Sequence, residues 1–309
     1  MTSTLALHGG AGTIPLARMA PGELDAHHAG LRDALRAGHR VLAAGGPALD
    51  AVTAAVMAME DNPLFNAGHG AVFTSAGMQE MDAAAMDGAT LRTGAVAGIR
   101  GPRNPVLAAR AVMEHSAHIL LAGDGALAFL RAHGVAFAEE SYFHTARRWD
   151  ALQRTLAGPD QVRDDADRHG TVGAVACDAA GHLAAATSTG GMTGKLPGRI
   201  GDTPLPGAGT WADGTAALSA TGHGESFIKV AAGHELSARM RLAGDGLDAA
   251  AEAVMAALGA IGGEGGFVAV DRTGRVAMPF NSGGMYRGTI GPDGVARTGV
   301  HREPLRAHP

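Results

Sequence analysis

The chain has 309 residues, of which 46% are hydrophobic and 18% are charged, a composition typical of globular rather than disordered proteins. The net charge of -5 argues against a nucleic acid or an anionic membrane surface as the main partner. The only cysteine, Cys177, excludes an intramolecular disulfide. No window resembles a membrane span, and the amino terminus lacks the basic and apolar regions of a signal peptide. We therefore expect a cytoplasmic protein.

The first half of the chain reads as alternating strands and helices. A strand is predicted at 3–8, ending in the turn GGAG, and a Gly- and Asn-rich loop at 62–77. His27 and His28 fall within the first helix without a nearby ligand set, so solvated surface histidines are expected there. The other expected elements are helices within 22–46, 47–61, 104–116 and 124–134, and strands at 80–88, 92–99 and 118–123.

From about residue 137 to residue 170 the apolar periodicity fades, apart from a weak amphipathic helix near 146–156. Charged, turn-prone residues predominate, so we predict a mobile linker that is open to proteolysis. After it, two pairs of strands, two helices and two last strands suggest sheets packed under helical layers. These elements are expected at 171–178, 182–189, 206–213, 215–222, 224–244, 246–262, 265–271 and 275–281.

Cofactor motifs are not convincing. The stretch GGMTGKLPG resembles a phosphate-binding loop around Lys195, but Leu196 replaces the required Ser or Thr, and Thr189 replaces the first Gly. The sequence also lacks the G-x-S-x-G elbow of serine hydrolases. Nothing in the sequence calls for a redox cofactor or a catalytic metal, and we predict neither.

Thr171 stands where a charged, turn-prone run meets a compact apolar strand, in DDADRHGTVGAVACD. One interpretation is that Thr, a good strand former, simply begins the strand. The other is that the chain is cleaved between Gly170 and Thr171. The new α-amino group, with a pKa of about 7.7–8, would then be a base for the Thr171 hydroxyl, which is otherwise a weak nucleophile.

Residues further along could serve such a nucleophile. Ser188 and Thr189 end the following strand, eighteen residues on. The loop KLPGRIGD carries Arg199 and Asp202, which suit the carboxylate and the ammonium of a zwitterion, although a surface ion pair is an equal alternative. In SATGHGES, Thr221 and the backbone N–H of Gly222 suit a tetrahedral oxyanion, and helix capping by Thr221 is the competing explanation.

Taken together, these residues resemble the isoaspartyl peptidase/L-asparaginase family, the plant-type asparaginases among the N-terminal nucleophile (Ntn) hydrolases. The resemblance runs nearly from end to end. It is carried by LALHGGAGTI, NPLFNAGHGAVFT, EMDAAAMDG, GAVAGI, RNPVLAARAVME, HGTVGAVACD, AAATSTGGMTGKLPGRIGDTPLPGAGTWAD, SATGHGESFIK and MPFNSGGMYRG.

This resemblance implies an α+β fold, a four-layer αββα sandwich over residues 1–309. It also implies autoproteolysis into an α subunit, 1–170, and a β subunit, 171–309, and assembly as a dimer of αβ heterodimers. Hydrolysis of the side-chain amide of L-asparagine or of β-aspartyl dipeptides would release L-aspartate. No nucleic acid or membrane partner is implied.

By motif, each candidate residue has an implied role. Thr171 would be nucleophile and base, and Thr189 would hydrogen-bond to it and tune its amine. Thr221 and Gly222 would form the oxyanion hole. The substrate carboxylate would bind Arg199, and its ammonium would bind Asp202 and the Gly224 carbonyl. Asn66 would help order the surroundings of the nucleophile.

The resemblance further implies a structural sodium ion, held by backbone carbonyls in the 59–69 loop. The stretch before Thr171 looks short for the family, which could slow maturation. The scissile HGTVG, in place of HDTIG, disfavours a glycosylasparaginase, which stays the alternative enzyme; an uncleaved, inactive aspartate-binding relative is another. The implied sodium ligands are the carbonyls of Met59, Glu60, Asn62, Phe65, Ala67 and His69.

Overall fold

The computed structural model describes residues 3–14, 19–158 and 170–308, which form a mixed α/β structure. Its strands are β1 (Thr4–Gly12), β2 (Met81–Asp87), β3 (Thr93–Ile99), β4 (Leu120–Ala122), β5 (Val172–Cys177), β6 (Leu183–Thr189), β7 (Thr210–Ala212), β8 (Ala216–Gly222), β9 (Gly265–Asp271), β10 (Val276–Ala277), β11 (Gly284–Ile290), β12 (Ala296–Gly299) and β13 (Arg306–His308). Its helices are α1 (Glu23–Ala43), α2 (Ala48–Glu60), α3 (Pro105–His115), α4 (Gly123–Ala132), α5 (Glu140–Phe143), α6 (Ala146–Leu156), α7 (Gly224–Val230), α8 (Ala232–Ala238) and α9 (Leu247–Ala260), with a 3₁₀ turn, η2 (Gly68–Gly70), and a π turn, η5 (Arg239–Ala243).

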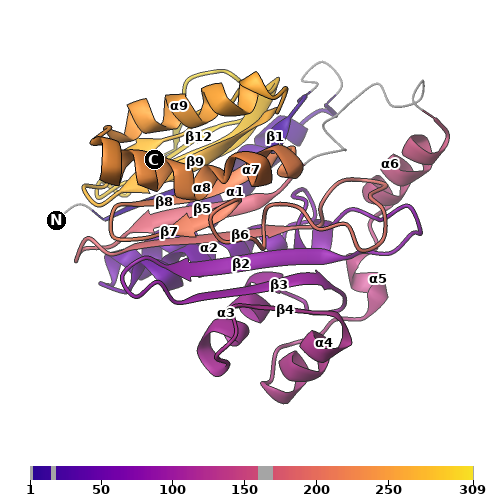
Figure 1. Ribbon diagram of the computed structural model, residues 1–309. Helices are drawn as coiled ribbons and strands as arrows, with labels where there is room; N and C mark the ends of the chain where they lie inside the picture. Colours follow the sequence, from indigo (N-terminus) through magenta and orange to yellow (C-terminus); the bar gives the residue numbers. More distant parts are fainter. Residues whose placement is uncertain (1–2, 15–18, 159–169, 309) are drawn as a thin grey trace.

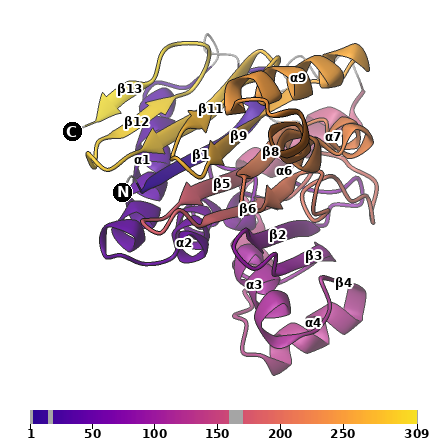
Figure 2. The ribbon, with the colours of Figure 1, turned by 60° about the vertical axis from the view of Figure 1, so that its left-hand side comes forward.

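Within the described residues, nine strands form one large sheet in the order β13-β12-β11-β1-β5-β6-β2-β3-β4. Figure 2 shows this order from the upper left to the lower right. Strand β1, from the beginning of the chain, lies between β11 and β5, which come from its second half. All the pairings are antiparallel except that of β3 with β4. The two halves of the chain therefore share one hydrogen-bonded sheet.

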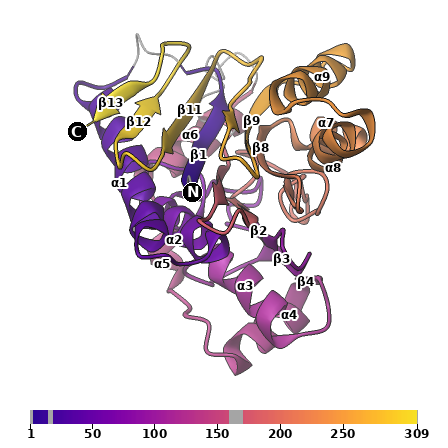
Figure 3. The same cartoon turned by 90° about the vertical axis from the view of Figure 1, so that its left-hand side faces the viewer.

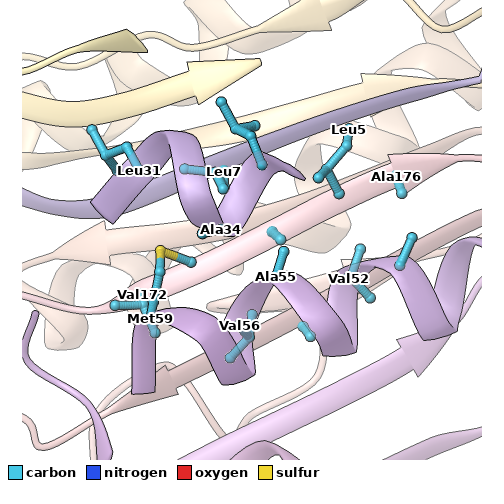
Figure 4. Packing of buried hydrophobic residues seen from close by; sticks show 14 of the residues in the cluster. Leu5, Leu7, Leu31, Ala34, Val52, Ala55, Val56, Met59, Val172 and Ala176 are labelled. Atoms are coloured by element: carbon cyan, nitrogen blue, oxygen red, sulfur yellow. The ribbon is translucent and has the colours of Figure 1, made fainter. Parts of the chain in front are cut away.

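Helices α1 and α2 cover one face of this sheet (Figure 3). Because successive side chains of a strand point to opposite faces, Leu5 and Leu7 of β1 and Val172 of β5 all face these helices. In Figure 4, Leu7 lies beside Leu31 of α1 and Val172 lies beside Met59 of α2. Burial of these apolar side chains, worth about 25 cal/mol per Å² of surface removed from water, joins segments that are far apart in the sequence.

A smaller sheet, in the order β10-β9-β8-β7, packs on the other face of the large sheet. Helices α7, α8 and α9 cover its far side (Figures 1 and 3). There the side chains of Phe227 and Leu236 belong to one buried apolar cluster with Leu218 and Phe267. Between the two sheets, residues such as Val175 and Val268 form a separate apolar cluster. The two sheets therefore lie face to face with a shared interior.

Several expectations from the sequence need correction. Strand β1 does not stop before GGAG but continues to Gly12 through an irregularity in its register after His8. The helix expected over 224–244 is broken at Ala231, which adopts a left-handed conformation with φ of 47°. Three further strands, β11 to β13, follow the last ones predicted, and β10 is only two residues long.

The histidines of α1 are the clearest error. The sequence pattern places His27 and His28 in solvent, yet both are buried. His27 stacks on Tyr286 with ring centroids 4.6 Å apart, and Nδ1 of His28 lies 2.7 Å from Oγ1 of Thr298. The pattern misses this because strands β11 and β12, which these side chains meet, are not predicted from it.

The region before Thr171 is only partly described. The helix expected near 146–156 is confirmed as α6, and Arg148 within it is buried and donates to the Gly70 carbonyl at 2.8 Å. Residues 159–169, on which part of the predicted mobile linker falls, lie outside the described residues. In the described parts of the chain, none of the helices has both the length and the hydrophobicity required to cross a bilayer.

Candidate active site

The side chains between the two sheets change from apolar to polar along the strands. At one end the space between the sheets is filled by apolar side chains, among them Met86, Val175 and Leu183. Toward the other end, alternate residues on the same strand faces are polar. Those polar residues are His8 on β1, Thr171 beside β5, Thr187 and Thr189 on β6, Asp82 on β2, and Ser219 and Thr221 on β8, all of them buried. Buried polar groups require partners. Several of these side chains bond one another, Thr171 with Thr189 and His8 with Ser219 among them, whereas Asp82 and Thr221 accept from backbone N–H groups.

Thr171 and Thr189 are brought together by the register of the β5–β6 hairpin. Val172 lies opposite Ser188, so the next residues outward, Thr171 and Thr189, are neighbours on the inter-sheet face. The Thr171 hydroxyl donates to Oγ1 of Thr189 at 3.1 Å. The same Oγ1 accepts from the Gly191 N–H at 2.9 Å. The Thr189 oxygen is thus fixed beside the Thr171 hydroxyl.

The Gly170 carbonyl oxygen receives two donors. Asn66 Nδ2 donates to it at 2.7 Å, and the Thr189 hydroxyl donates at 3.0 Å. Asn66 is itself held, because its Oδ1 accepts from the Val72 N–H at 3.0 Å and its Nδ2 also donates to the Gly191 carbonyl. Both side chains are buried. This is the arrangement that stabilises negative charge developing on a carbonyl oxygen.

Thr221 and Gly222 end strand β8 close to β1. The Thr221 hydroxyl accepts from the Ala11 N–H at 3.1 Å, and α7 begins after His223 without a side-chain cap. Helix capping by Thr221 is therefore not what the structure shows. Gly222 has φ of 138°, a conformation that favours glycine, and a Cβ on it would lie 2.4 Å from the Glu264 carbonyl oxygen.

Arg199, Asp202 and Gly224 converge. A Cβ built on Gly224 would lie 2.7 Å from Oδ1 of Asp202 and 3.2 Å from Nη2 of Arg199. Arg199 is not paired with Asp202 but forks onto Glu225, with Nε–Oε1 at 2.9 Å and Nη2–Oε2 at 2.8 Å. The Asp202 carboxyl is buried, and its Oδ2 has no hydrogen-bond partner in the described structure. A buried carboxyl oxygen without a donor is costly and suits an incoming cation.

Comparison with known proteins agrees with this geometry. The family model described as Asparaginase matches residues 1–300. The chain belongs to the asparaginase family. It is 47% identical to the isoaspartyl peptidase of Salmonella typhimurium over 310 residues, covering 97% of this chain and 99% of the relative. It is 46% identical to the isoaspartyl peptidase of Escherichia coli, covering 97% of each, and 41% identical to the plant-type L-asparaginase of Pyrococcus furiosus, covering 89% and 92%.

The two carboxyl groups of this asparaginase-family site, Asp202 and Glu225, differ in their pKa values. Burial raises the pKa of the Asp202 carboxyl to about 6, against the opposing effects of its own backbone N–H and of Arg199. Hydrogen bonds from Arg199 lower the pKa of Glu225, whose side chain is 55% exposed. Near neutral pH both carboxyls are mainly ionised, but only Asp202 lacks a donor on one oxygen. An ammonium group would supply one.

The sodium ion implied by the resemblance would take its ligands from backbone carbonyls of the 59–69 loop. The loop folds back on the carboxyl end of α2, since a Cβ on Gly68 would lie 2.6 Å from the Glu60 carbonyl oxygen. Carbonyls at a helix end carry partial negative charge, and each has two lone pairs. Those of Asn62 and Phe65 accept one loop N–H each, which leaves capacity for an ion. No group of three His, Cys, Asp or Glu side chains suited to a metal occurs among the residues described.

Three residues of the site are not identified by sequence reasoning. His8 and Ser219 contact the surroundings of Thr171, and Glu225 holds Arg199. A signal for Glu225 existed, because it lies in the first turn of the helix that follows Thr221 and Gly222. His8 lies in the motif LALHGGAGTI, but nothing local indicates that its ring faces a strand 163 positions away.

Proposed function

We propose that this protein is an autoproteolytic threonine hydrolase that releases L-aspartate from L-asparagine or from β-aspartyl dipeptides. The observation that carries the proposal is that Thr189 contacts both reacting groups: its Oγ1 accepts from the Thr171 hydroxyl, and its hydroxyl donates, with Asn66, to the Gly170 carbonyl. The names of its relatives, isoaspartyl peptidase and plant-type L-asparaginase, indicate the substrate class. Two sheets packed face to face between helices support the finer assignment of an αββα sandwich of the Ntn-hydrolase type.

Maturation would begin with attack of Thr171 Oγ on the Gly170 carbonyl carbon. The proton of that hydroxyl passes toward Thr189, whose oxygen lies 3.1 Å away. Negative charge develops on the Gly170 oxygen, where Asn66 and Thr189 donate. The C–N bond then breaks, the Thr171 nitrogen takes the proton that left its own Oγ, and water hydrolyses the resulting ester. Residues 1–170 and 171–309 become the α and β subunits.

Turnover would use the same oxygen with a new base. The freed α-amino group of Thr171 takes the proton from its own hydroxyl, and Oγ attacks the β-carbonyl of the substrate. The Thr221 hydroxyl and the Gly222 N–H stabilise the oxyanion. Ammonia or the downstream amino acid leaves with a proton, and water then releases aspartate from the acyl-enzyme. Thr189 holds the Thr171 hydroxyl beside the amine of the same residue.

Substrate orientation would come from the charged residues. Arg199, held from one side by Glu225, presents its remaining N–H groups to the substrate α-carboxylate. Asp202 and the Gly224 carbonyl accept from the α-ammonium. We further propose the dimer of αβ heterodimers and a structural sodium ion on the carbonyls of the 59–69 loop. No cofactor is proposed for catalysis, and a cytoplasmic location stays a prediction.

The test is a time course of purified protein on a denaturing gel, with Thr171→Ala as the control. Wild type should yield two fragments, of 170 and 139 residues by the sequence, and the variant should stay intact. Mature protein should hydrolyse L-asparagine and a β-aspartyl dipeptide. A single full-length band with full activity would contradict the mechanism. An intact chain that binds aspartate without turnover would indicate an inactive relative, and preference for a glycosylated asparagine would indicate the alternative amidase.

A further inference from the structure

A row of buried polar side chains extends behind the candidate nucleophile. Nδ1 of His8 lies 2.9 Å from the backbone carbonyl oxygen of Thr171, and Nε2 of His8 lies 2.9 Å from Oγ of Ser219. The Ser219 oxygen lies 2.7 Å from Oγ1 of Thr187, which is 2.7 Å from Oγ1 of Thr210. The row links both sheets, since Ser219 and Thr210 belong to the smaller one.

The direction of each hydrogen bond in this row follows from its first member. A carbonyl oxygen only accepts, so Nδ1 of His8 must carry the proton and donate to Thr171. Burial lowers the pKa of the His8 imidazole to about 3, so the ring is neutral and its Nε2 is an acceptor. The Ser219 hydroxyl therefore donates to His8, and the Thr187 hydroxyl donates to Ser219. The Nδ1–H tautomer of His8 thus satisfies the hydrogen bonds from the Thr171 carbonyl to the Thr187 hydroxyl.

Gly173 provides the space for this row. His8, Gly173 and Thr187 lie side by side on three neighbouring strands of the large sheet. A Cβ on Gly173 would lie 1.8 Å from Oγ of Ser219 and 2.7 Å from Nε2 of His8. Ser219 thus reaches across from the smaller sheet into the place where Gly173 has no side chain. Any larger residue at position 173 would separate His8 from Ser219.

We propose that His8 is a positioning residue for Thr171, fixed by Ser219 as the Nδ1–H tautomer and holding the carbonyl of the nucleophile itself. The inference rests on the proposed function and adds a residue to it. Rotation about the Cα–C bond of Thr171 sets where its nitrogen and its Oγ lie relative to its carbonyl. Once the Gly170–Thr171 bond is cut, the peptide tether on the nitrogen is lost. The His8 hydrogen bond then keeps the carbonyl, and with it the amine and the hydroxyl, in the reactive orientation.

A pair of matched variants separates this role from mere packing. In His8→Asn the amide nitrogen stands close to the position of Nδ1 and can still donate to Thr171. His8→Leu fills a similar volume without a donor. With mature protein and a β-aspartyl dipeptide, we expect kcat of the Asn variant within about fivefold of wild type, and kcat of the Leu variant about 100-fold lower, the loss that follows from misplacing a reacting group by about 1 Å. KM should change less than about twofold in both, since Arg199 and Asp202 are untouched.

Ser219→Ala provides a second variant in case His8→Leu fails to fold. It leaves the ring without a partner on Nε2, and we expect kcat to fall about 10-fold with KM unchanged. Equal losses of kcat in the Asn and Leu variants, wild-type kcat in the Leu variant, or wild-type kcat in Ser219→Ala would each overturn the proposal. Nitrogen-15 NMR of wild-type protein between pH 5 and pH 8 is independent of activity. It should show His8 protonated on Nδ1 alone, and an Nε2–H signal would also overturn it. Wild type that is inactive on both substrates, with this NMR signature intact, would refute the proposed function instead.

Discussion

Asn66→Ala removes a donor to the Gly170 carbonyl during maturation, together with the contacts of Asn66 to Gly191 and Val72. The side chain supplies one of the two donors to that oxygen, at 2.7 Å, and Thr189 supplies the other, at 3.0 Å. Loss of one such donor in an oxyanion hole costs a factor of about 10²–10³ in rate, or about 2.7–4 kcal/mol in the transition state. The first-order rate of cleavage between Gly170 and Thr171 should fall by that factor.

The assay is the fraction of cleaved chain against time on a denaturing gel, starting from freshly purified precursor. Asn62→Ala is the matched control. It lies in the same loop and loses one side-chain hydrogen bond to backbone, to the Leu64 N–H at 3.0 Å, whereas the donors to the Gly170 carbonyl are Asn66 and Thr189. A cleavage rate of Asn66→Ala within about threefold of wild type would contradict a role for Asn66 in stabilising this oxyanion, and so would equal slowing in Asn62→Ala.

Two further predictions concern protons. Burial raises the pKa of Asp202 to about 6, and an ordinary α-amino group has a pKa of about 7.7–8. With an amine of that pKa on Thr171, log kcat/KM should fall with slope 1 below about pH 8 and with slope 2 below about pH 6. The slope of kcat should stay at 1, because a bound ammonium keeps Asp202 ionised, and persistence of the second break in Asp202→Asn would assign it to another group. Burial also raises the pKa of Glu60 to about 8; its folded form holds a proton that the unfolded form loses above about pH 4.5. The contribution of protonated Glu60 to the free energy of unfolding is therefore complete below about pH 4.5. It decreases by about 1.4 kcal/mol per pH unit as the pH rises from there to about 8. Denaturant unfolding should show Glu60→Gln gaining on wild type over that window, and parallel curves for the two proteins would contradict the assignment.

Part of the fold could be predicted from local pattern alone. Two compact apolar stretches, at 171–178 and 182–189, indicated the β5–β6 hairpin, and its short turn sets the register that makes Thr171 and Thr189 neighbours. Helical spacing likewise indicated α1, α2 and α6. The prediction failed for segments whose secondary structure depends on a partner that is distant in the sequence. Strands β11 to β13 lack a long apolar run, and they form because β1 offers an edge on which β11 pairs.

The candidate site divides in the same way. The local motifs suffice to identify the groups available to Thr171, because a hydroxyl, a guanidinium and a carboxylate have a fixed chemistry. Thr189, Arg199 and Asp202 can all be found in this way. Their protonation states and their hydrogen-bond partners depend on the packing of the two sheets. Burial between two sheets raises the pKa of Asp202, and the crossing of β8 over Gly173 joins His8 to Ser219, 211 positions away. The pKa of a group depends on its exposure to solvent, and its hydrogen bonds depend on its neighbours in space. Both are set by the packing of the sheets, so the local sequence does not contain them.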